Sequence, residues 1–114
     1  MLTAKIRVQP AEGSWVVRAD GAVIGDSKRA LELLEQNREP VIYFPREDLA
    51  MAFLEASDTS LPNTQKGRAS FFNVVLKSRS IDDAAWTIEE PSEEAARIAG
   101  YVAFDPSLVT IEQL

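Results

Sequence analysis

The dipeptide Asp20-Gly21 places the strongest constraint on the fold of this chain. It separates two short apolar runs, residues 14–19 and residues 22–25. Glycine takes the positive φ angle that a type I′ turn requires, so Asp-Gly between two strand-like runs predicts a β-hairpin. The sequence therefore predicts antiparallel sheet near its N-terminus.

Other short segments alternate polar and apolar residues with the period of a strand. We expect strands at residues 5–9, 41–44, 69–77, 82–88, 101–104 and 109–112. Trp86 is expected to pack across Phe72 or Val74 of the neighbouring strand, as cross-strand aromatic pairs do. Residues 26–36 fit two structures, because their leucines are good helix formers but also fit one face of a strand.

Two short helices are predicted where prolines interrupt the alternation. Pro45 suits the first position of a helix, which we expect to run to about Leu54 and to be buried. The second helix is predicted at residues 93–98, where Gly100 ends it.

Residues 55–67 are polar and lack periodicity, so we expect a long loop of the kind that often carries function. The predicted fold class is mainly β, a β-rich α+β arrangement of seven or eight mostly antiparallel strands with two short helices. The chain has 114 residues, and we expect one compact domain over residues 1–114.

The composition excludes several kinds of chemistry. The chain contains no histidine and no cysteine, so it cannot form a disulfide, a Cys/His zinc site or a Ser-His-Asp triad. Only oxygen ligands remain for a metal, and no segment gathers them, so we expect no bound metal and no cofactor. The formal net charge of −6 has the same sign as a phosphate backbone, so we expect no nucleic-acid partner.

The apolar runs are all much shorter than the ~20 residues of a membrane-spanning helix, so no membrane partner is expected. The first residues, Met-Leu-Thr-Ala-Lys-Ile-Arg-Val, lack the apolar block of a signal peptide. The expected location is therefore the cytoplasm.

Three segments carry a family resemblance. They are the run Tyr43-Phe44-Pro45-Arg46-Glu47-Asp48; Ser57-Asp58 with Lys66-Gly67 and Ala69-Ser70; and Asp83-Ala84-Ala85-Trp86 with Pro91, Glu94-Ala95 and Ile98-Ala99-Gly100-Tyr101-Val102-Ala103-Phe104. In this order and spacing they resemble the bacterial domain-of-unknown-function family 427. The resemblance covers nearly the whole chain.

The resemblance implies a small β fold related to the β-tent group, which includes the methionine-R-sulfoxide reductases and the thalidomide-binding domain of cereblon. It also favours a strand within residues 26–36. The family has no established activity. Many members carry a His-Cys-Pro-Tyr-like run where this chain has Pro62-Asn63-Thr64-Gln65, so any metal or thiol role of that run is absent here.

Arg46 and Lys66 are the main candidate binding residues. If the predicted loop at residues 55–67 folds over the start of the first helix, both cations meet at a helix N-terminus and can bind an anion. Without a ligand, we expect a carboxylate such as Asp48 or Asp58 between them. The alternative is that Arg46 forms an ordinary surface ion pair and Lys66 is solvated.

Tyr101 and Asp48 are candidates for orienting the ligand, and Trp86 is a candidate wall of the pocket. For Trp86 a place in the core is the alternative, which its apolar neighbours favour. Asp82 and Asp83 are adjacent in a predicted strand and point to opposite faces. They do not form the converging carboxylate pair that a nucleotidyltransferase needs for its metal.

The function predicted from the sequence is the binding of a small anionic molecule in a pocket near Arg46 and Lys66. Two alternatives remain open. One is an enzyme that uses Asp, Lys or Tyr acid–base chemistry in the same cleft. The other is a structural or protein-interaction module that has no pocket.

Overall fold

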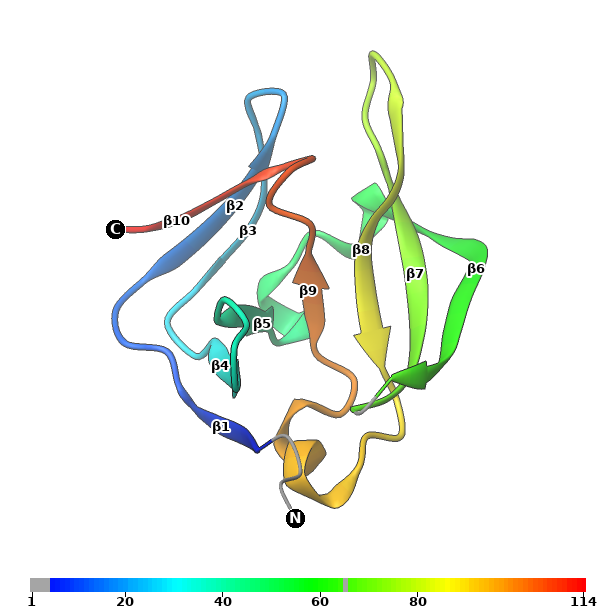
Figure 1. The fold of residues 1–114 in the computed structure, drawn as a ribbon. Helices are drawn as coiled ribbons and strands as arrows, with labels where there is room; N and C mark the ends of the chain where they lie inside the picture. The colour runs from blue at the N-terminus through cyan, green and yellow to red at the C-terminus, as the bar shows by residue number, and fades with distance from the viewer. Residues whose placement is uncertain (1–4, 65) are drawn as a thin grey trace.

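Two antiparallel sheets make up the fold (Figure 1). The computed structural model describes residues 5–64 and 66–114, and within these ranges it contains ten strands. The larger sheet has the strand order β1-β4-β5-β9-β8-β7-β6, and the smaller sheet has the order β10-β2-β3. The mainly β class is confirmed, with more strands than the seven or eight that were predicted.

The strands of the larger sheet are β1 (Ile6–Pro10), β4 (Leu31–Glu35), β5 (Val41–Phe44), β6 (Leu54–Thr64), β7 (Gly67–Val75), β8 (Ser80–Ile88) and β9 (Val102–Phe104). Those of the smaller sheet are β2 (Trp15–Ala19), β3 (Ala22–Ser27) and β10 (Thr110–Gln113). Three 3-10 turns complete the described elements: η1 (Arg46–Asp48), η2 (Met51–Phe53) and η3 (Glu93–Ile98).

The hairpin of β2 and β3 forms where the Asp-Gly dipeptide predicts it. Asp20 has a φ angle of 49° and Gly21 one of 84°, so both central residues have the positive φ of a type I′ turn. The twist of this turn matches that of the flanking strands, which lets β2 and β3 pair directly.

The ambiguous segment at residues 26–36 contains a strand, β4, as the family resemblance favours. β4 pairs with β1 on one side and β5 on the other, and Leu31 and Leu33 are buried on the same face. Hydrogen bonds on both edges outweigh the helix propensity of the leucines, which is at most a few tenths of a kcal/mol per residue.

The predicted helix from Pro45 to about Leu54 is wrong. The chain forms two separate 3-10 turns, η1 and η2, and none of their residues is buried. Between the turns Leu49 is extended and forms a β-bridge with Gly25, and the Ala50 N–H donates to the Ile24 carbonyl at 2.7 Å. In a continuous helix these backbone groups would form hydrogen bonds within the helix, but here they bond to β3 instead.

The predicted loop at residues 55–67 is also wrong. Most of it belongs to β6, which pairs with β7 at the edge of the larger sheet. Two register shifts interrupt the pairing, and most of the strand's side chains are exposed. An exposed edge strand needs no buried apolar face, and polar residues there discourage pairing with other chains. Gln65 lies outside the described residues.

A β-bulge in β8 changes which residues face Trp86. Asp83 has a φ angle of 53°, and its N–H donates to the side-chain oxygen of Asn73 at 2.9 Å. Between the pairs Phe72–Ala85 and Val74–Ile81, one residue of β7 therefore lies opposite three residues of β8. Beyond the bulge Trp86 lies opposite Phe71, with ring centroids 6.1 Å apart, so the predicted packing across Phe72 or Val74 is wrong.

The larger sheet buries apolar residues on both faces. On one face Ile42, Phe44 and Phe104 pack against Val17 and Ile24 of the smaller sheet. On the other face a second cluster is covered at one end by η3, the orange turn at the bottom of Figure 1. The rest of that second face is where the candidate site lies. No helix among the described residues is long and apolar enough to cross a membrane.

Candidate functional site

Arg46 joins three parts of the chain. Its Nε donates to the Gly100 carbonyl at 2.7 Å, and its Nη2 donates to the Glu89 carboxylate at 2.8 Å. The guanidinium also lies over the ring of Phe72, 5.7 Å from its centroid, which is cation–π distance. Arg46 thus connects η1 to the end of β8 and to the residue that precedes Tyr101.

Lys66 forms a salt bridge with Glu35 on the face of the sheet opposite Arg46. The Nζ–Oε1 distance is 2.6 Å, and the side chains are only 18% and 7% exposed. Glu35 is the last residue of β4, and Lys66 directly precedes β7. These two strands are four strand-to-strand steps apart, and at about 4.8 Å per step a flat sheet would separate them by about 19 Å. Because the side chains meet, the sheet must curl strongly at this face.

The two predicted cations lie on opposite faces of the sheet. Arg46 covers Phe72, whereas Phe71 lines the same hollow as Lys66, and consecutive strand residues face opposite sides. Their carboxylate partners are also different, Glu89 and Glu35. The prediction that one carboxylate lies between Arg46 and Lys66 is therefore wrong, and the two side chains do not form a shared site.

Asp48 holds η1 against the end of β3. Its carboxylate accepts a hydrogen bond from the Ser27 hydroxyl at 2.7 Å and two from the Arg29 guanidinium, at 2.8 and 3.3 Å. The hydrogen bonds from Arg29 and then from Ser27 lower the pKa of the Asp48 carboxyl. These hydrogen bonds explain the position of the Asp48 carboxylate without a ligand.

Tyr101 is half-buried against the second apolar cluster. Its N–H donates to the Ile98 carbonyl at 2.9 Å, and its carbonyl accepts from the Thr87 hydroxyl at 2.7 Å. It does not line the hollow that contains Lys66.

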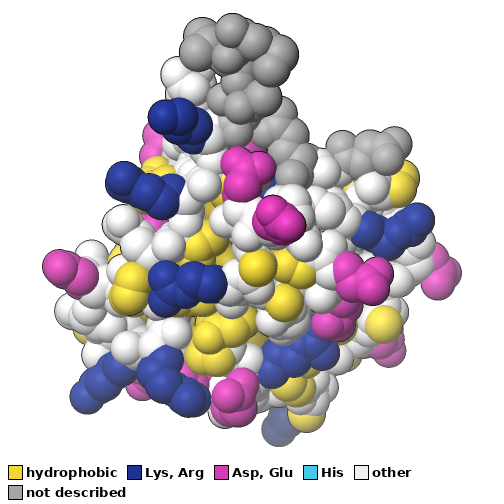
Figure 2. Space-filling view, turned by 90° about the horizontal axis from the view of Figure 1, so that it is seen from below, with side chains coloured by type: hydrophobic (Ala, Val, Ile, Leu, Met, Phe, Trp, Pro, Cys, Tyr) yellow, Lys and Arg dark blue, Asp and Glu magenta, His cyan; other side chains and the backbone are white. Residues whose placement is uncertain are grey.

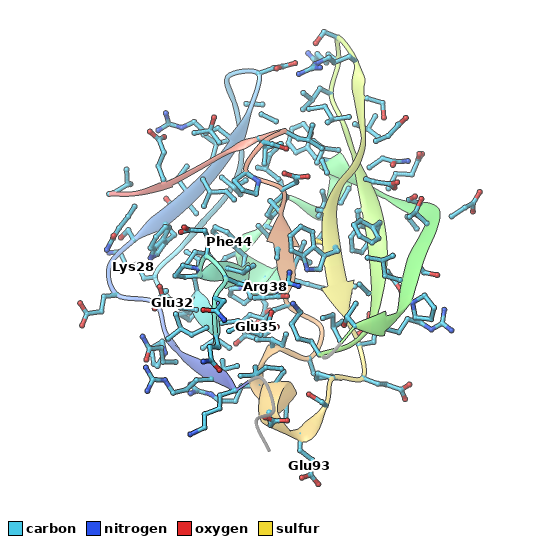
Figure 3. All side chains as sticks on the ribbon, in the orientation of Figure 1. Lys28, Glu32, Glu35, Arg38, Phe44 and Glu93 are labelled. Carbon is cyan, nitrogen blue, oxygen red and sulfur yellow. The ribbon has the colours of Figure 1, made fainter. Side chains whose placement is uncertain are left out.

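A hollow of about 460 Å³ opens beside the Lys66–Glu35 pair, and we call it the Lys66 pocket. Five apolar side chains line it, together with three charged side chains and one hydroxyl. Its lining consists of Glu35, Arg38, Leu61, Thr64, Lys66, Ala69, Phe71, Trp86 and Ile88. Glu35 is the last residue of β4 and Arg38 lies in the turn that leads to β5; both are labelled in Figure 3.

Of the predicted site residues, the Lys66 pocket brings together Lys66 and Trp86. Arg46, Tyr101 and Asp48 lie outside its lining. Trp86 is half-buried and packs on Phe71, so it is both part of the apolar cluster and a wall of the pocket.

Sequence reasoning missed Glu35 and Arg38. A signal for Glu35 was present, because Leu31, Leu33 and Glu35 follow each other at every second position of β4. Such residues share one face of a strand, so a carboxylate at the end of a buried face indicated a partner there. Arg38 lies in a turn, where the sequence carries no comparable pattern.

A buried tyrosine lies next to the pocket wall. The Trp86 Nε1–H donates to the Tyr43 hydroxyl at 3.2 Å, and Tyr43 is fully buried. Burial raises the pKa of Tyr43 to about 12, and the negative charge of Glu35 adds to the increase, while the hydrogen bond from Trp86 lowers it. Tyr43 therefore stays protonated at neutral pH, and its ring fixes the direction of the indole.

The wider surface has mixed character. Figure 2, seen from below, shows hydrophobic side chains exposed along the middle of one face, bordered by side chains of both charges. Among residues 5–64 and 66–114, no three Asp or Glu side chains gather closely enough to hold a metal ion.

The family model described as "Domain of unknown function (DUF427)" matches residues 7–113, so the chain belongs to this family. The resemblance seen in the sequence is thereby confirmed. No curated protein matches the chain.

Proposed function

We propose that this domain binds a small carboxylate whose body is flat and apolar, in the Lys66 pocket. The main observation in favour of this proposal is the charge of the side chains that line the pocket. Lys66 and Arg38 supply two positive charges there and Glu35 one negative charge, in a chain whose net charge is −6. A local excess of positive charge beside an apolar hollow favours an anionic group on an apolar ligand.

The apolar walls support a flat ligand body. Phe71 and Trp86 supply aromatic rings, which suit stacking, and Ala69 and Ile88 add small or branched apolar side chains to the lining. The volume of about 460 Å³ falls within the ~300–1,000 Å³ of typical small-molecule sites. This hollow supports ligand binding over an interaction module that has no pocket.

An acid–base enzyme receives less support from the same cleft. Tyr43 contacts the pocket wall through its hydrogen bond with Trp86, and its pKa is raised to about 12. A general acid or base works best when its pKa lies near the operating pH. Tyr43 is therefore better suited to positioning Trp86 than to transferring protons.

The proposal is tested with 2-naphthoate, a flat carboxylate, by isothermal titration calorimetry. Arg38 is exposed, so Arg38→Ala leaves the fold intact, and we expect it to raise the dissociation constant about three- to tenfold, or about 0.7–1.4 kcal/mol. Lys28→Ala is the matched control, because Lys28 is exposed and lies outside the pocket lining. The neutral analogue 2-naphthamide should bind more weakly than 2-naphthoate and should not distinguish the Arg38 variant.

Lys66 is tested together with its partner. Lys66→Met alone would leave the Glu35 carboxylate buried without its cation, which destabilises the fold for reasons unrelated to the ligand. The double variant Lys66→Met/Glu35→Gln removes both charges, and we expect it to abolish measurable binding. Unchanged binding in this variant, or equal effects of Arg38→Ala and Lys28→Ala, would contradict the proposal.

A further inference from the structure

The charged side chains that line the Lys66 pocket nearly cancel one another. Lys66 and Arg38 are positive and Glu35 is negative, so the lining carries one net positive charge. A singly charged anion neutralises this lining. A doubly charged anion would instead leave one uncompensated negative charge in the pocket, within a chain whose net charge is already −6.

The carboxylate of Glu35 is fixed where a ligand anion must approach Lys66. Its side chain is only 7% exposed, and its Oε1 lies 2.6 Å from the Nζ of Lys66. Burial is the main cause of the raised pKa of Tyr43, and the charge of Glu35 adds to it, so this charge acts on a neighbour of the pocket wall. Because solvent screens a buried carboxylate weakly, Glu35 repels further negative charge placed near it.

Arg38 is the cation of the lining that is not used within the fold. In the part of the chain that the structure describes, no Asp or Glu forms an ion pair with Arg38. Lys66 has three N–H donors and can contact a ligand while it keeps Glu35, but its positive charge is then shared between two anions. The lining therefore compensates one negative charge of a ligand and has no cation for a second.

From this charge balance we infer that the Lys66 pocket selects singly charged anions over doubly charged ones such as phosphate monoesters, and that Glu35 is the specificity-determining residue. Binding sites commonly discriminate by a repulsive element as well as by attractive contacts, and Glu35 is that element here. The inference rests on the proposed function, because it names the charge of the ligand that the same site accepts.

The test compares 2-naphthyl sulfate with 2-naphthyl phosphate at pH 8 by isothermal titration calorimetry. The two esters share the ring and a tetrahedral anionic group, but the sulfate carries one negative charge and the phosphate two, because the second pKa of a phosphate monoester is about 6. We expect the native protein to bind the sulfate about tenfold more tightly than the phosphate.

Variants at position 35 separate charge from packing. Glu35→Gln removes the negative charge, and the preference for the sulfate should disappear, whereas Glu35→Asp keeps the charge and should keep the preference. Glu93→Gln is the matched control, because Glu93, at the bottom of Figure 3, is exposed and lies outside the pocket lining. Each ratio compares two ligands on one protein, so a lower stability of a variant affects both affinities alike and cancels.

Equal affinity of the native protein for the two esters would overturn the inference, and this measurement needs no variant. A preference for the sulfate that survives in Glu35→Gln, or the binding of neither ester by a protein that binds 2-naphthoate, would also overturn it. If 2-naphthoate still binds in an Arg38-dependent way, the proposed function stands alone. If 2-naphthoate does not bind, both fall.

Discussion

Arg46 shows at the scale of one residue how a side chain suited to ligand binding is used within the fold. Its planar guanidinium donates in two directions, to the Gly100 carbonyl and to Glu89, while its flat face covers Phe72. A lysine offers a point charge without this fixed geometry. The same property that made Arg46 a candidate for anion recognition makes it an effective cross-link.

Arg46→Ala should therefore lower stability and leave ligand binding unchanged. It removes the hydrogen bonds to Gly100 and Glu89, so we expect a loss of about 1–3 kcal/mol in the free energy of unfolding. Urea unfolding measures the change, and Arg46→Lys should recover part of it through Glu89. A variant that unfolds like the native protein but binds 2-naphthoate more weakly would place Arg46 in the site after all.

Tyr43 gives a prediction for alkaline pH. Its pKa is raised to about 12 in the folded protein, whereas an unfolded tyrosine has a pKa of about 10. Above pH 10 the unfolded state loses this proton first, so the free energy of unfolding should fall as pH rises from about 10 to 12. The fall amounts to about 2–3 kcal/mol at the upper end.

Urea titrations at pH 9, 10, 11 and 12 measure this slope, and Tyr43→Phe provides the comparison. The variant lacks the ionisable hydroxyl, so its stability should fall less steeply over the same range. Equal slopes in the two proteins would show that the hydroxyl of Tyr43 ionises as easily in the fold as in the unfolded chain.

At the scale of elements, the sequence predicted those structures whose signal is local. The β2–β3 hairpin depends on the φ angles of two adjacent residues, Asp20 and Gly21, and it formed as predicted. β6 was missed because an exposed edge strand with two register shifts has no period-2 pattern. The helix after Pro45 was overpredicted because contacts with β3, more than twenty residues away, decide the backbone there.

The turn between β6 and β7 depends on Gly67, which has a φ angle of 126°. A Cβ at this position would lie 2.8 Å from the Glu90 carbonyl oxygen and 3.2 Å from the Pro91 Cα, both backbone atoms. We expect Gly67→Ala to destabilise the protein by about 2–4 kcal/mol, from strain and from displacement of this backbone.

Gly21→Ala is the matched control for Gly67→Ala. Gly21 also has a positive φ, 84°, but an added Cβ would meet no atom within 4 Å. Gly21→Ala should therefore lower the free energy of unfolding by about 1 kcal/mol, from backbone strain alone. Equal losses of stability in thermal or urea unfolding would mean that the backbone at Glu90 moves away without cost.

At the scale of the whole molecule, the candidate site exists because the larger sheet curls. Lys66 and Glu35 meet although β7, which follows Lys66, and β4, which ends at Glu35, are four steps apart in the sheet order. The sequence identified Lys66 and Trp86, but strand order and curvature depend on long-range pairing that no local pattern encodes. For this reason the sequence analysis predicted Arg46 as the neighbour of Lys66, whereas the actual neighbour is Glu35.

The central claim is that a carboxylate ligand occupies the Lys66 pocket, and the position of the bound ligand tests it most directly. With methyl-labelled protein, we predict NOEs between the ring protons of bound 2-naphthoate and the methyl groups of Leu61 and Ile88, which line the pocket. Val23 and Leu108 are exposed apolar residues outside it and should show none. NOEs to Val23 or Leu108 without any to Leu61 and Ile88 would contradict the account.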